Sequence, residues 1–374
     1  MYLYDNCDAE EVKKLILSKK YFRNQGENVE THCTKFEKDF SKFMGAPHSL
    51  LVTSGTNALI CALTALELKP NDEVLIPAYT FFATAAAVVN AGGKPKIINI
   101  DEYLSLDTAE VELAITKNTK AIIAVHMDGR PCDMNSILNL CKKYSLVLIE
   151  DVAQAVGGTY KNQRLGSLGD YGCYSFNVDK IISCGEGGAV ITKTRKNFEK
   201  ILSAHDGCCS FGPTFKNSFT EIKPSVGFSM RASEIQGLMI HQQLKKLDSI
   251  ISTLKQRQNI LKSILPTINS HDTDGECGTS IFLKFNSVDD CQKKLIELQR
   301  EKIKAIAINM RPAHSVWQWI KILQEKFGPA EYKISDYLKT IDVLTTVLKI
   351  DVLFDLDLKN TEIFADQILR IIKN

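Results

Sequence analysis

The sequence predicts an α/β protein in which a large domain, built on a mostly parallel sheet flanked by helices, precedes a smaller α+β domain. Short apolar runs alternate with helical patterns between residues 49 and 205, as in consecutive βα units. A long amphipathic helical pattern at 232–265 then leads to a polar stretch at 271–276, which marks a domain boundary. A chain of 374 residues is long enough for two domains. We place the large domain, with an N-terminal helical segment, at residues 1–248 and the small domain at 249–374.

The individual elements follow from the period of their apolar residues. Two helical segments are expected between residues 9 and 43, and the second places Val29, Cys33, Phe36 and Phe40 on one stripe. Further strands are expected at 49–52, 73–77, 96–100, 120–126, 146–149, 170–176 and 189–192, and further helices at 58–66, 83–90, 109–116, 134–144 and 198–205. After an irregular segment at 207–225 and the long helix, the small domain should contain strands at 280–285, 304–309 and 348–352 and helices at 288–301 and 361–372.

Composition and charge exclude several classes of function. The net charge is +2, from 46 basic and 44 acidic residues, and no long run has a single sign, so a surface for nucleic acid or an anionic membrane is not expected. No apolar run approaches the roughly 20 residues that span a bilayer. No GxGxxG motif follows a strand, and His126 and His205 are too poorly accompanied by ligand types to predict a metal site.

Cysteine usage and the N-terminus favour a cytoplasmic protein. The 11 cysteines are odd in number and show no CxxC spacing, as expected for reduced thiols. The first residues contain neither a basic region nor an apolar region of a signal peptide. We therefore expect a reducing compartment and no membrane partner.

The turn at 53–57 joins an expected strand to an expected helix. A strand, a turn of small residues and a helix N-terminus form an anion site, because free backbone N–H groups and the positive end of the helix dipole meet there. Thr56 and Asn57 are also ordinary N-cap residues, which any helix can use. Both interpretations of the turn are open at this point.

The stretch 149–192 combines the groups that suggest chemistry. An apolar run delivers Asp151 to a strand end, where ligands of open α/β sheets collect. Ser175 ends another strand, and Lys180 follows it ahead of a Gly-rich turn. An amine, a carboxylate and hydroxyl or N–H donors are what pyridoxal phosphate requires. Taken singly, a lysine is usually solvated and an aspartate after a strand usually stabilises a turn.

Four motifs in this stretch resemble the DegT/DnrJ/EryC1/StrS family of aminotransferases. They are Glu150-Asp151-Val152-Ala153-Gln154, Gly166-Ser167-Leu168-Gly169-Asp170, Ser175-Phe176-x-x-x-Lys180 and Gly185-Glu186-Gly187-Gly188. The resemblance covers the chain up to about Asp248. It implies the aspartate-aminotransferase fold (fold type I of the pyridoxal-phosphate-dependent transferases) and amination of keto-sugars, with pyridoxamine phosphate formed in the half-reaction.

The resemblance implies roles for the residues nearest the reacting atoms. Lys180 would hold the cofactor aldehyde and, once released, carry the proton. Asp151 would pair with the pyridine nitrogen, and Gln154 would lie near the ring face and phenolic oxygen. Glu150 should point to the opposite face of the strand, so no catalytic role is expected for it.

The resemblance also implies how the rest of the cofactor is held. Ser54, Gly55 and Thr56 stand at the family's Ser-Gly-Thr position and, with Ser175, would bind the phosphate. Phe81 stands at the position of an aromatic residue that stacks on the cofactor ring. A phenylalanine at a strand–helix junction is otherwise most often a core residue.

Substrate and interface residues match the family less well. Ser229 stands where relatives have an Asn that reaches the partner's cofactor phosphate across a dimer interface. Arg231 is expected to orient a neighbouring loop or bind an anionic group. His314 loosely resembles a histidine that faces the sugar pocket, but Trp317 and Trp319 beside it depart from the pattern, which suggests an atypical sugar.

The sequence thus predicts a homodimeric, cytoplasmic, pyridoxal-phosphate-dependent aminotransferase. Glutamate or glutamine would donate the amino group to a keto-sugar, either nucleotide-linked or an unusual monosaccharide, for polysaccharide or secondary-metabolite synthesis. One alternative is a sugar dehydratase that uses pyridoxamine phosphate; such relatives have histidine where this chain has Lys180, which argues against it. The other is a non-catalytic binding or regulatory protein on the same fold.

Overall fold

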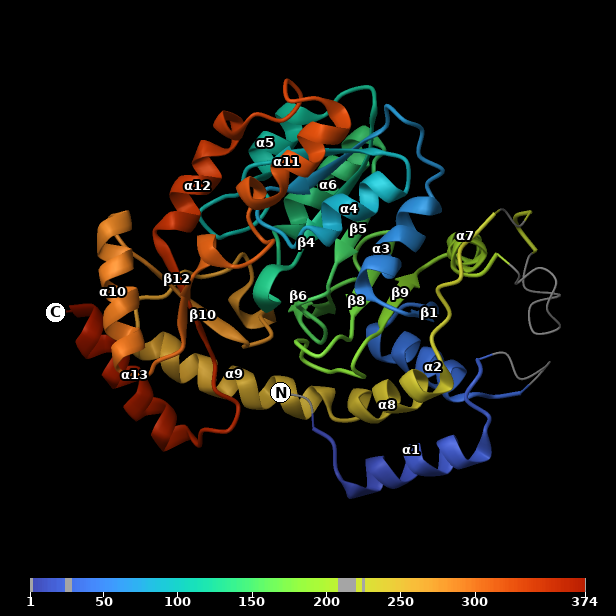
Figure 1. Ribbon diagram of the computed structural model, residues 1–374, viewed down its shortest axis with the longest axis horizontal. Helices are drawn as coiled ribbons and strands as arrows, with labels where there is room; N and C mark the ends of the chain where they lie inside the picture. Colours follow the sequence, from blue (N-terminus) through green and yellow to red (C-terminus); the bar gives the residue numbers. More distant parts are fainter. Residues whose placement is uncertain (1–2, 24–28, 208–219, 224–225, 374) are drawn as a thin grey trace.

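A central seven-stranded sheet and a smaller three-stranded sheet organise the computed structural model, which describes residues 3–23, 29–207, 220–223 and 226–373 (Figure 1). Most of the irregular segment expected at 207–225 lies outside the described residues. Among the described residues, no helix is both long and apolar enough to cross a membrane, and no group of three or more potential ligands could hold a metal ion.

The large sheet confirms the expected mostly parallel architecture. Its order is β1-β9-β8-β5-β4-β2-β3, and only β9 runs antiparallel to its neighbours. The connection from β8 to β9 contains no crossover helix, which is why the chain returns antiparallel. The strands are β1 (His48–Val52), β2 (Glu73–Pro77), β3 (Lys94–Ile98), β4 (Thr119–Val125), β5 (Val147–Asp151), β8 (Tyr171–Ser175) and β9 (Gly188–Thr192), all within two residues of the expected bounds.

Helices cover both faces of this sheet because successive strand residues point to opposite sides. In β4, for example, Ile123 belongs to one apolar core and Ile122 to the other. The first core also contains residues of α3 (Gly55–Thr64), α4 (Ala83–Asn90) and α7 (Arg195–His205). The second contains residues of α2 (His32–Met44), α5 (Thr108–Ala114), α6 (Met134–Tyr144) and α8 (Glu234–Leu244). Helices α3 and α7 begin three residues earlier than expected, because Ser54 and Thr194 cap them.

The N-terminal helices correct one expectation. Helix α1 (Asn6–Ser18) is followed by α2, which begins at His32 after the N-cap Thr31. Cys33, Phe36 and Phe40 are fully buried as predicted, but Val29 precedes the helix and is 45% exposed. The spacing of Val29 fits the stripe, but the capping box of Thr31 starts the helix after it.

The long helix expected at 232–265 is two helices. Helix α8 ends at Leu244 and α9 (Leu247–Ile264) begins three residues later. At the break, Lys246 reaches back to the N-terminal segment, where its Nζ lies 2.6 Å from Asp8 and 3.2 Å from Asp5. Helix α8 packs against α2 and α1, whereas α9 packs against the C-terminal helix α13 (Leu358–Lys373). The amphipathic spacing of apolar residues continues from α8 into α9, so the sequence pattern did not reveal the break.

The C-terminal part contains the expected strands as an antiparallel sheet of order β10-β12-β11. These are β10 (Ser280–Lys284), β11 (Ala305–Ala307) and β12 (Val347–Asp351), accompanied by α10 (Val288–Arg300) and α13. Two further helices, α11 (Val316–Phe327) and α12 (Leu338–Thr345), were not predicted.

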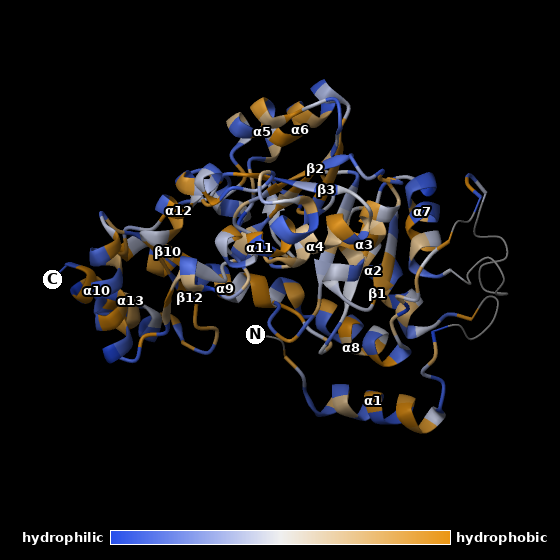
Figure 2. Cartoon of the chain, turned by 45° about the horizontal axis from the view of Figure 1, so that its top comes forward, coloured by the Kyte–Doolittle hydropathy of each residue, from blue (hydrophilic) through white to orange (hydrophobic). Residues whose placement is uncertain are grey.

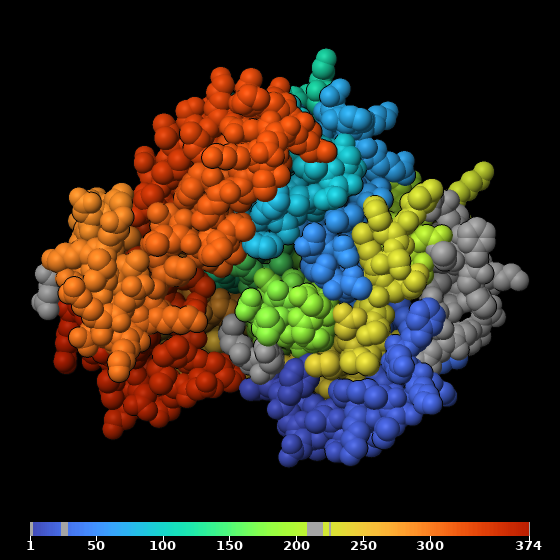
Figure 3. Space-filling view, viewed as in Figure 1, coloured from blue at the N-terminus to red at the C-terminus, as the bar shows by residue number. Residues whose placement is uncertain are grey.

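Helices α11 and α12 fold back over the first third of the chain (Figures 1 and 3). Trp319 is buried with its ring centroid 5.6 Å from that of Phe82, and the Tyr332 hydroxyl donates to the Pro95 carbonyl at 2.7 Å. Phe82 is partly buried and packs against the first apolar core. The domain boundary at residue 248 stays a prediction, because residues on both sides of it share the two apolar cores.

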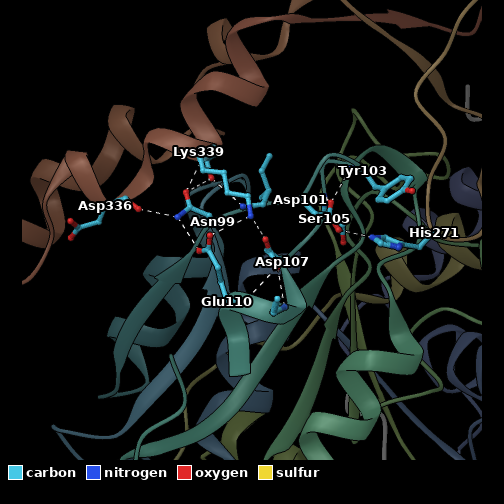
Figure 4. Close-up of polar contacts among 12 residues, drawn as sticks. Asn99, Asp101, Tyr103, Ser105, Asp107, Glu110, His271, Asp336 and Lys339 are labelled. Atoms are coloured by element: carbon cyan, nitrogen blue, oxygen red, sulfur yellow. Dashed lines mark hydrogen bonds and ion pairs between the residues drawn. The ribbon is translucent and has the colours of Figure 1, made fainter. Parts of the chain in front are cut away.

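Polar contacts strengthen the same junction at the edge strand β3 (Figure 4). The Asn99 amide donates to Glu110 at 3.0 Å and to the Asp336 carbonyl at 2.9 Å. Lys339 on α12 contacts Asp107 and lies 3.4 Å from Glu110. The C-terminal segment thus covers an edge that would otherwise expose unpaired backbone groups.

Glu150 is a buried structural carboxylate on β5. It accepts hydrogen bonds from the backbone N–H groups of Gly166, Leu168 and Gly169 at 2.7–2.8 Å. His126 Nε2 lies 3.1 Å from it, and because His126 Nδ1 accepts from the Cys132 N–H, the ring proton is on Nε2 and is donated to Glu150. Glu150, on the face of β5 opposite Asp151, therefore holds the loop 166–169 in place.

We expect Glu150→Gln to lower the free energy of unfolding by about 2–4 kcal/mol, since an amide leaves buried N–H donors unpaired. Urea denaturation at neutral pH would measure the loss. The matched control is Glu102→Gln, at an exposed position after β3. Equal midpoints for the two variants would show that the carboxylate is not what holds the loop.

Candidate active site

Asp151 and Lys180 line one cavity at the carboxyl end of β5. Asp151 is buried and accepts hydrogen bonds from the Thr84 hydroxyl at 3.0 Å and the Ala153 N–H at 3.1 Å. Burial raises the pKa of Asp151, and these hydrogen bonds and the Lys180 charge oppose that effect. Burial lowers the pKa of Lys180, against the attraction of Asp151. The structure brings together a carboxylate and an amine with depressed basicity.

The N-terminus of α3 borders the same cavity. Ser54 is its N-cap, with Oγ accepting from the Asn57 N–H at 3.1 Å, so neither Thr56 nor Asn57 is the cap. Within the described part of the chain, the N–H groups of Gly55 and Thr56 have no hydrogen-bond partner. Ser175, at the end of β8, borders the same space. These donors can bind an anion.

Two glycines make this end of the cavity compact. A Cβ on Gly55 would lie 2.6 Å from the Ser175 Cβ, and one on Gly188 would lie 2.3 Å from the Ser54 carbonyl oxygen. No other residue allows β8, β9 and α3 to approach this closely. Because these two glycines have no side chain, the Ser175 hydroxyl and the backbone N–H groups of α3 can lie close together.

We expect Gly55→Ala to raise the dissociation constant of a phosphorylated cofactor about 10-fold or more, because the added methyl group pushes Ser175 away from the free N–H groups. Spectroscopic titration of the apoprotein with pyridoxal phosphate would measure it. Pyridoxal without phosphate is the control ligand, since its weaker binding should change little. Equal losses for the two ligands would contradict a phosphate site here.

Phe81 and Gln154 border both this cavity and a larger one of about 520 Å³ outside it. The Phe81 side chain is 47% exposed, and its ring centroid is 5.3 Å from that of His314. An exposed ring at this position can stack on a ligand, and it is not the core residue that its local sequence also permits. Gln154 Oε1 accepts from the Asp128 N–H at 3.0 Å, and its Nε2 is 3.4 Å from His314 Nε2.

The outer cavity contains a charged cluster that the sequence did not reveal. Asp128 accepts from the Tyr79 hydroxyl at 3.0 Å and from Arg311 Nη1 at 2.7 Å, and Lys349 Nζ is 3.4 Å away. Burial alone would raise the pKa of Asp128, but Arg311 and Lys349 hold it well below its usual value. Asp128 has the left-handed backbone conformation (φ 54°, ψ 32°), which aspartate tolerates better than most residues. No local pattern links residues 128, 311 and 349.

His314 lies at the outer cavity as the sequence suggested. Its Nδ1–H donates to the Pro312 carbonyl at 2.7 Å, and its Nε2 faces Arg311 Nη2 at 3.4 Å. Burial and the Arg311 charge lower the pKa of His314 to about 4. The ring is therefore neutral near pH 7, and its Nε2 lone pair faces the N–H groups of Gln154 and Arg311.

Ser229 and Arg231 line neither cavity of their own chain. Ser229 is exposed and forms an isolated bridge with Asp206. Arg231 Nη1 lies 2.6 Å from the Asp206 carboxylate and its guanidinium lies over Phe22. Their suggested roles at the phosphate and substrate stay predictions.

Residues 5–347 match the DegT/DnrJ/EryC1/StrS aminotransferase family. The chain belongs to this family. It is 38% identical over 216 residues to a GDP-perosamine synthase of Caulobacter vibrioides, covering 57% of this chain and 56% of that relative. It is 44% identical over 158 residues to a UDP-N-acetyl-3-dehydro-alpha-D-glucosamine 3-aminotransferase of Acidithiobacillus ferrooxidans, covering 42% and 43% of the two chains. The alignments thus span about half the length of these curated relatives.

Solved structures establish the fold of this family member over the whole chain. The aminotransferase from Psychrobacter cryohalolentis superimposes with a TM-score of 0.86 at 23% identity, covering 100% of this chain and 99% of that one. Helicobacter pylori PseC, titled an aminotransferase of pseudoaminic acid biosynthesis, gives a TM-score of 0.80 at 24% identity, with 100% and 98% covered. The predicted fold type I, with its large sheet and smaller C-terminal α+β part, is confirmed.

Proposed function

We propose that the protein is a pyridoxal-phosphate-dependent aminotransferase that transfers an amino group to a keto-sugar. The observation that carries this proposal is that Lys180, Asp151 and the N-terminus of α3, with its free N–H groups, line one cavity. An amine, a carboxylate and an anion cradle correspond to the aldehyde, ring nitrogen and phosphate of this cofactor. A Cβ on Gly55 would collide with Ser175 beside these N–H groups, so the glycine keeps this space open for a phosphate.

Each side chain then has a defined task. Pyridoxal phosphate supplies the aldehyde that takes the amino group and the ring that withdraws electrons from the reacting carbon. Asp151 would keep the ring nitrogen protonated, and Ser54, Gly55, Thr56 and Ser175 would hold the phosphate. Lys180 would hold the cofactor and, once released, would carry the proton on its Nζ. Phe81 would cover the ring and exclude water.

Family relatives support a sugar as the acceptor. Their names include GDP-perosamine synthase, an aminotransferase of a UDP-linked 3-dehydro sugar, and a spore coat polysaccharide biosynthesis protein of Bacillus subtilis. A relative from Micromonospora echinospora is named a putative L-glutamine:3-amino-2,3-dideoxy-scyllo-inosose aminotransferase, which gives glutamine as its donor. We propose glutamate or glutamine as donor and a keto-sugar as acceptor, within polysaccharide or secondary-metabolite synthesis. Lys180, where dehydratases have histidine by resemblance, favours amination over dehydration.

A homodimer in the cytoplasm is part of the same proposal. Helix α1 carries both hydrophobic and hydrophilic residues (Figure 2). Its Leu17 is 72% exposed, and Val226, three positions before Ser229, is 94% exposed. Phe22, Val178 and Phe228 are exposed as well. Apolar surface of this kind is typical of an interface, and a second copy would cover it. The nine described cysteines are unpaired, which supports a reducing compartment.

The test is to incubate the purified protein, loaded with pyridoxal phosphate, with glutamate or glutamine and a panel of keto-sugars. We expect release of the corresponding keto acid and an aminated sugar. Borohydride should fix the cofactor on Lys180, which mass spectrometry of peptides would show. A protein that takes up no cofactor on Lys180 is not an aminotransferase, and this result would favour the non-catalytic alternative.

A further inference from the structure

Arg311 has a free hydrogen-bonding edge that faces the active-site cavity. It lines the outer cavity together with Lys180, and its charge is among the causes that lower the pKa of Lys180. Its Nη1 is fully used, by Asp128 at 2.7–2.9 Å and by the Tyr79 hydroxyl at 2.7 Å. Its Nη2 has only His314 Nε2 at 3.4 Å, and within the described residues its Nε has no partner. The Nε–H and Nη2–H groups form the fork that binds a carboxylate with two parallel hydrogen bonds.

The surrounding charges hold the guanidinium in place without blocking this fork. Asp128 binds the Nη1 side of Arg311 and is shared with Lys349, whose Nζ is also 2.7 Å from Asp351. Two cations and two carboxylates therefore cancel. An incoming carboxylate, whether from an amino acid or from an unreactive analogue, therefore meets no net negative charge at the fork.

The two substrates of the proposed reaction differ in this chemistry. The amino donor carries a carboxylate on the carbon that bears the reacting amine, whereas a keto-sugar ring carries hydroxyls there. A cluster close to Lys180 whose charges cancel can accept the carboxylate of the donor and, in turn, the hydroxyls of the sugar. His314, neutral near pH 7, adds no competing charge beside the fork.

We propose that Arg311, held in position by Asp128 and Tyr79, is the receptor for the α-carboxylate of the amino donor. This inference rests on the proposed function, because it assigns the donor subsite of that reaction. Asp128 is then a positioning residue that acts through Arg311. Sequence motifs of the cofactor site do not include either residue.

The experiment compares two donors that differ only at this group, L-glutamine and L-glutaminamide, in single-turnover bleaching of the visible band of the loaded enzyme. The wild type should prefer glutamine about 10- to 100-fold, the strength of a charged hydrogen-bonded pair. In Arg311→Gln the preference should fall to within about 3-fold, because the fork is gone. Arg311→Lys, which keeps a cation beside Asp128, should lie between and covers the case in which Arg311→Gln does not fold. Arg300→Gln, at an exposed position on α10, is the control.

A direct binding measurement separates failure of this inference from failure of the proposed function. Glutarate, which cannot react, should bind the wild type in calorimetry, and Arg311→Gln should weaken it about 10-fold or more. Absence of glutarate binding in the wild type, equal binding to Arg311→Gln, or a donor preference that survives in that variant would each overturn the assignment of Arg311. If no amino donor bleaches the wild-type enzyme, the proposed function fails, and glutarate binding still decides whether Arg311 is a carboxylate receptor.

Discussion

Lys180→Ala is expected to lower aminotransferase turnover by about 10⁴-fold or more, since one side chain both holds the cofactor and moves the proton. The lysine lies at the cavity with Asp151, and burial lowers its pKa below that of an exposed lysine. Keto-acid release from glutamate or glutamine measures the loss. Borohydride treatment should leave the cofactor attached to the wild type but not to the variant.

The matched control for this substitution is Lys196→Ala, at an exposed position on α7. It should keep wild-type turnover and cofactor attachment. Addition of methylamine to Lys180→Ala should restore part of the rate, because a small amine can enter the space left by the side chain and carry the proton. Full turnover in Lys180→Ala would show that another amine performs these tasks.

Asp151→Asn is expected to lower turnover by about 10²- to 10³-fold, the usual loss when one preorganised electrostatic partner is removed. The amide is isosteric and can still accept from the Ala153 N–H, so the fold should be retained. It has no negative charge, however, and cannot keep a ring nitrogen protonated. The absorption spectrum of the bound cofactor should change together with the rate.

Asp366→Asn, at an exposed position on α13, is the control for Asp151→Asn. Denaturation midpoints should be close for both variants, which assigns the lost turnover to charge. If Asp151→Asn had wild-type turnover and an unchanged spectrum, Asp151 would not be the partner of the ring nitrogen.

Local sequence patterns predicted the strands and helices whose apolar residues have a regular spacing. The strands of the large sheet follow from short apolar runs, and the alternation within β5 correctly separated Glu150 from Asp151. The break at Lys246 was missed because the helical spacing of apolar residues continues through it, and the contact of Lys246 with Asp8 joins segments far apart in the sequence. Helix α11 was within reach, since Val316, Trp319, Ile320 and Leu323 have helical spacing and are buried.

Some residues of the candidate site could likewise be associated from local sequence, whereas others are brought together only by the tertiary fold. Asp151, Ser175 and Lys180 lie within 30 positions of one another on adjacent elements, so one stretch of sequence was enough to associate them. Asp128, Arg311 and Lys349 come from three distant segments, and only the tertiary fold places them around one cavity. Phe81 could be placed by resemblance, whereas its exposure required the structure.

The return of α11 and α12 to the first third of the chain has a consequence for biosynthesis. During translation, Phe82 and the β3 edge are made long before Trp319 and Lys339, which cover them. A nascent chain that stops near residue 310 would present an uncovered apolar surface and an open strand edge, a combination that invites aggregation or chaperone capture. Completion of the early α/β units thus waits until α11 and α12 have left the ribosome.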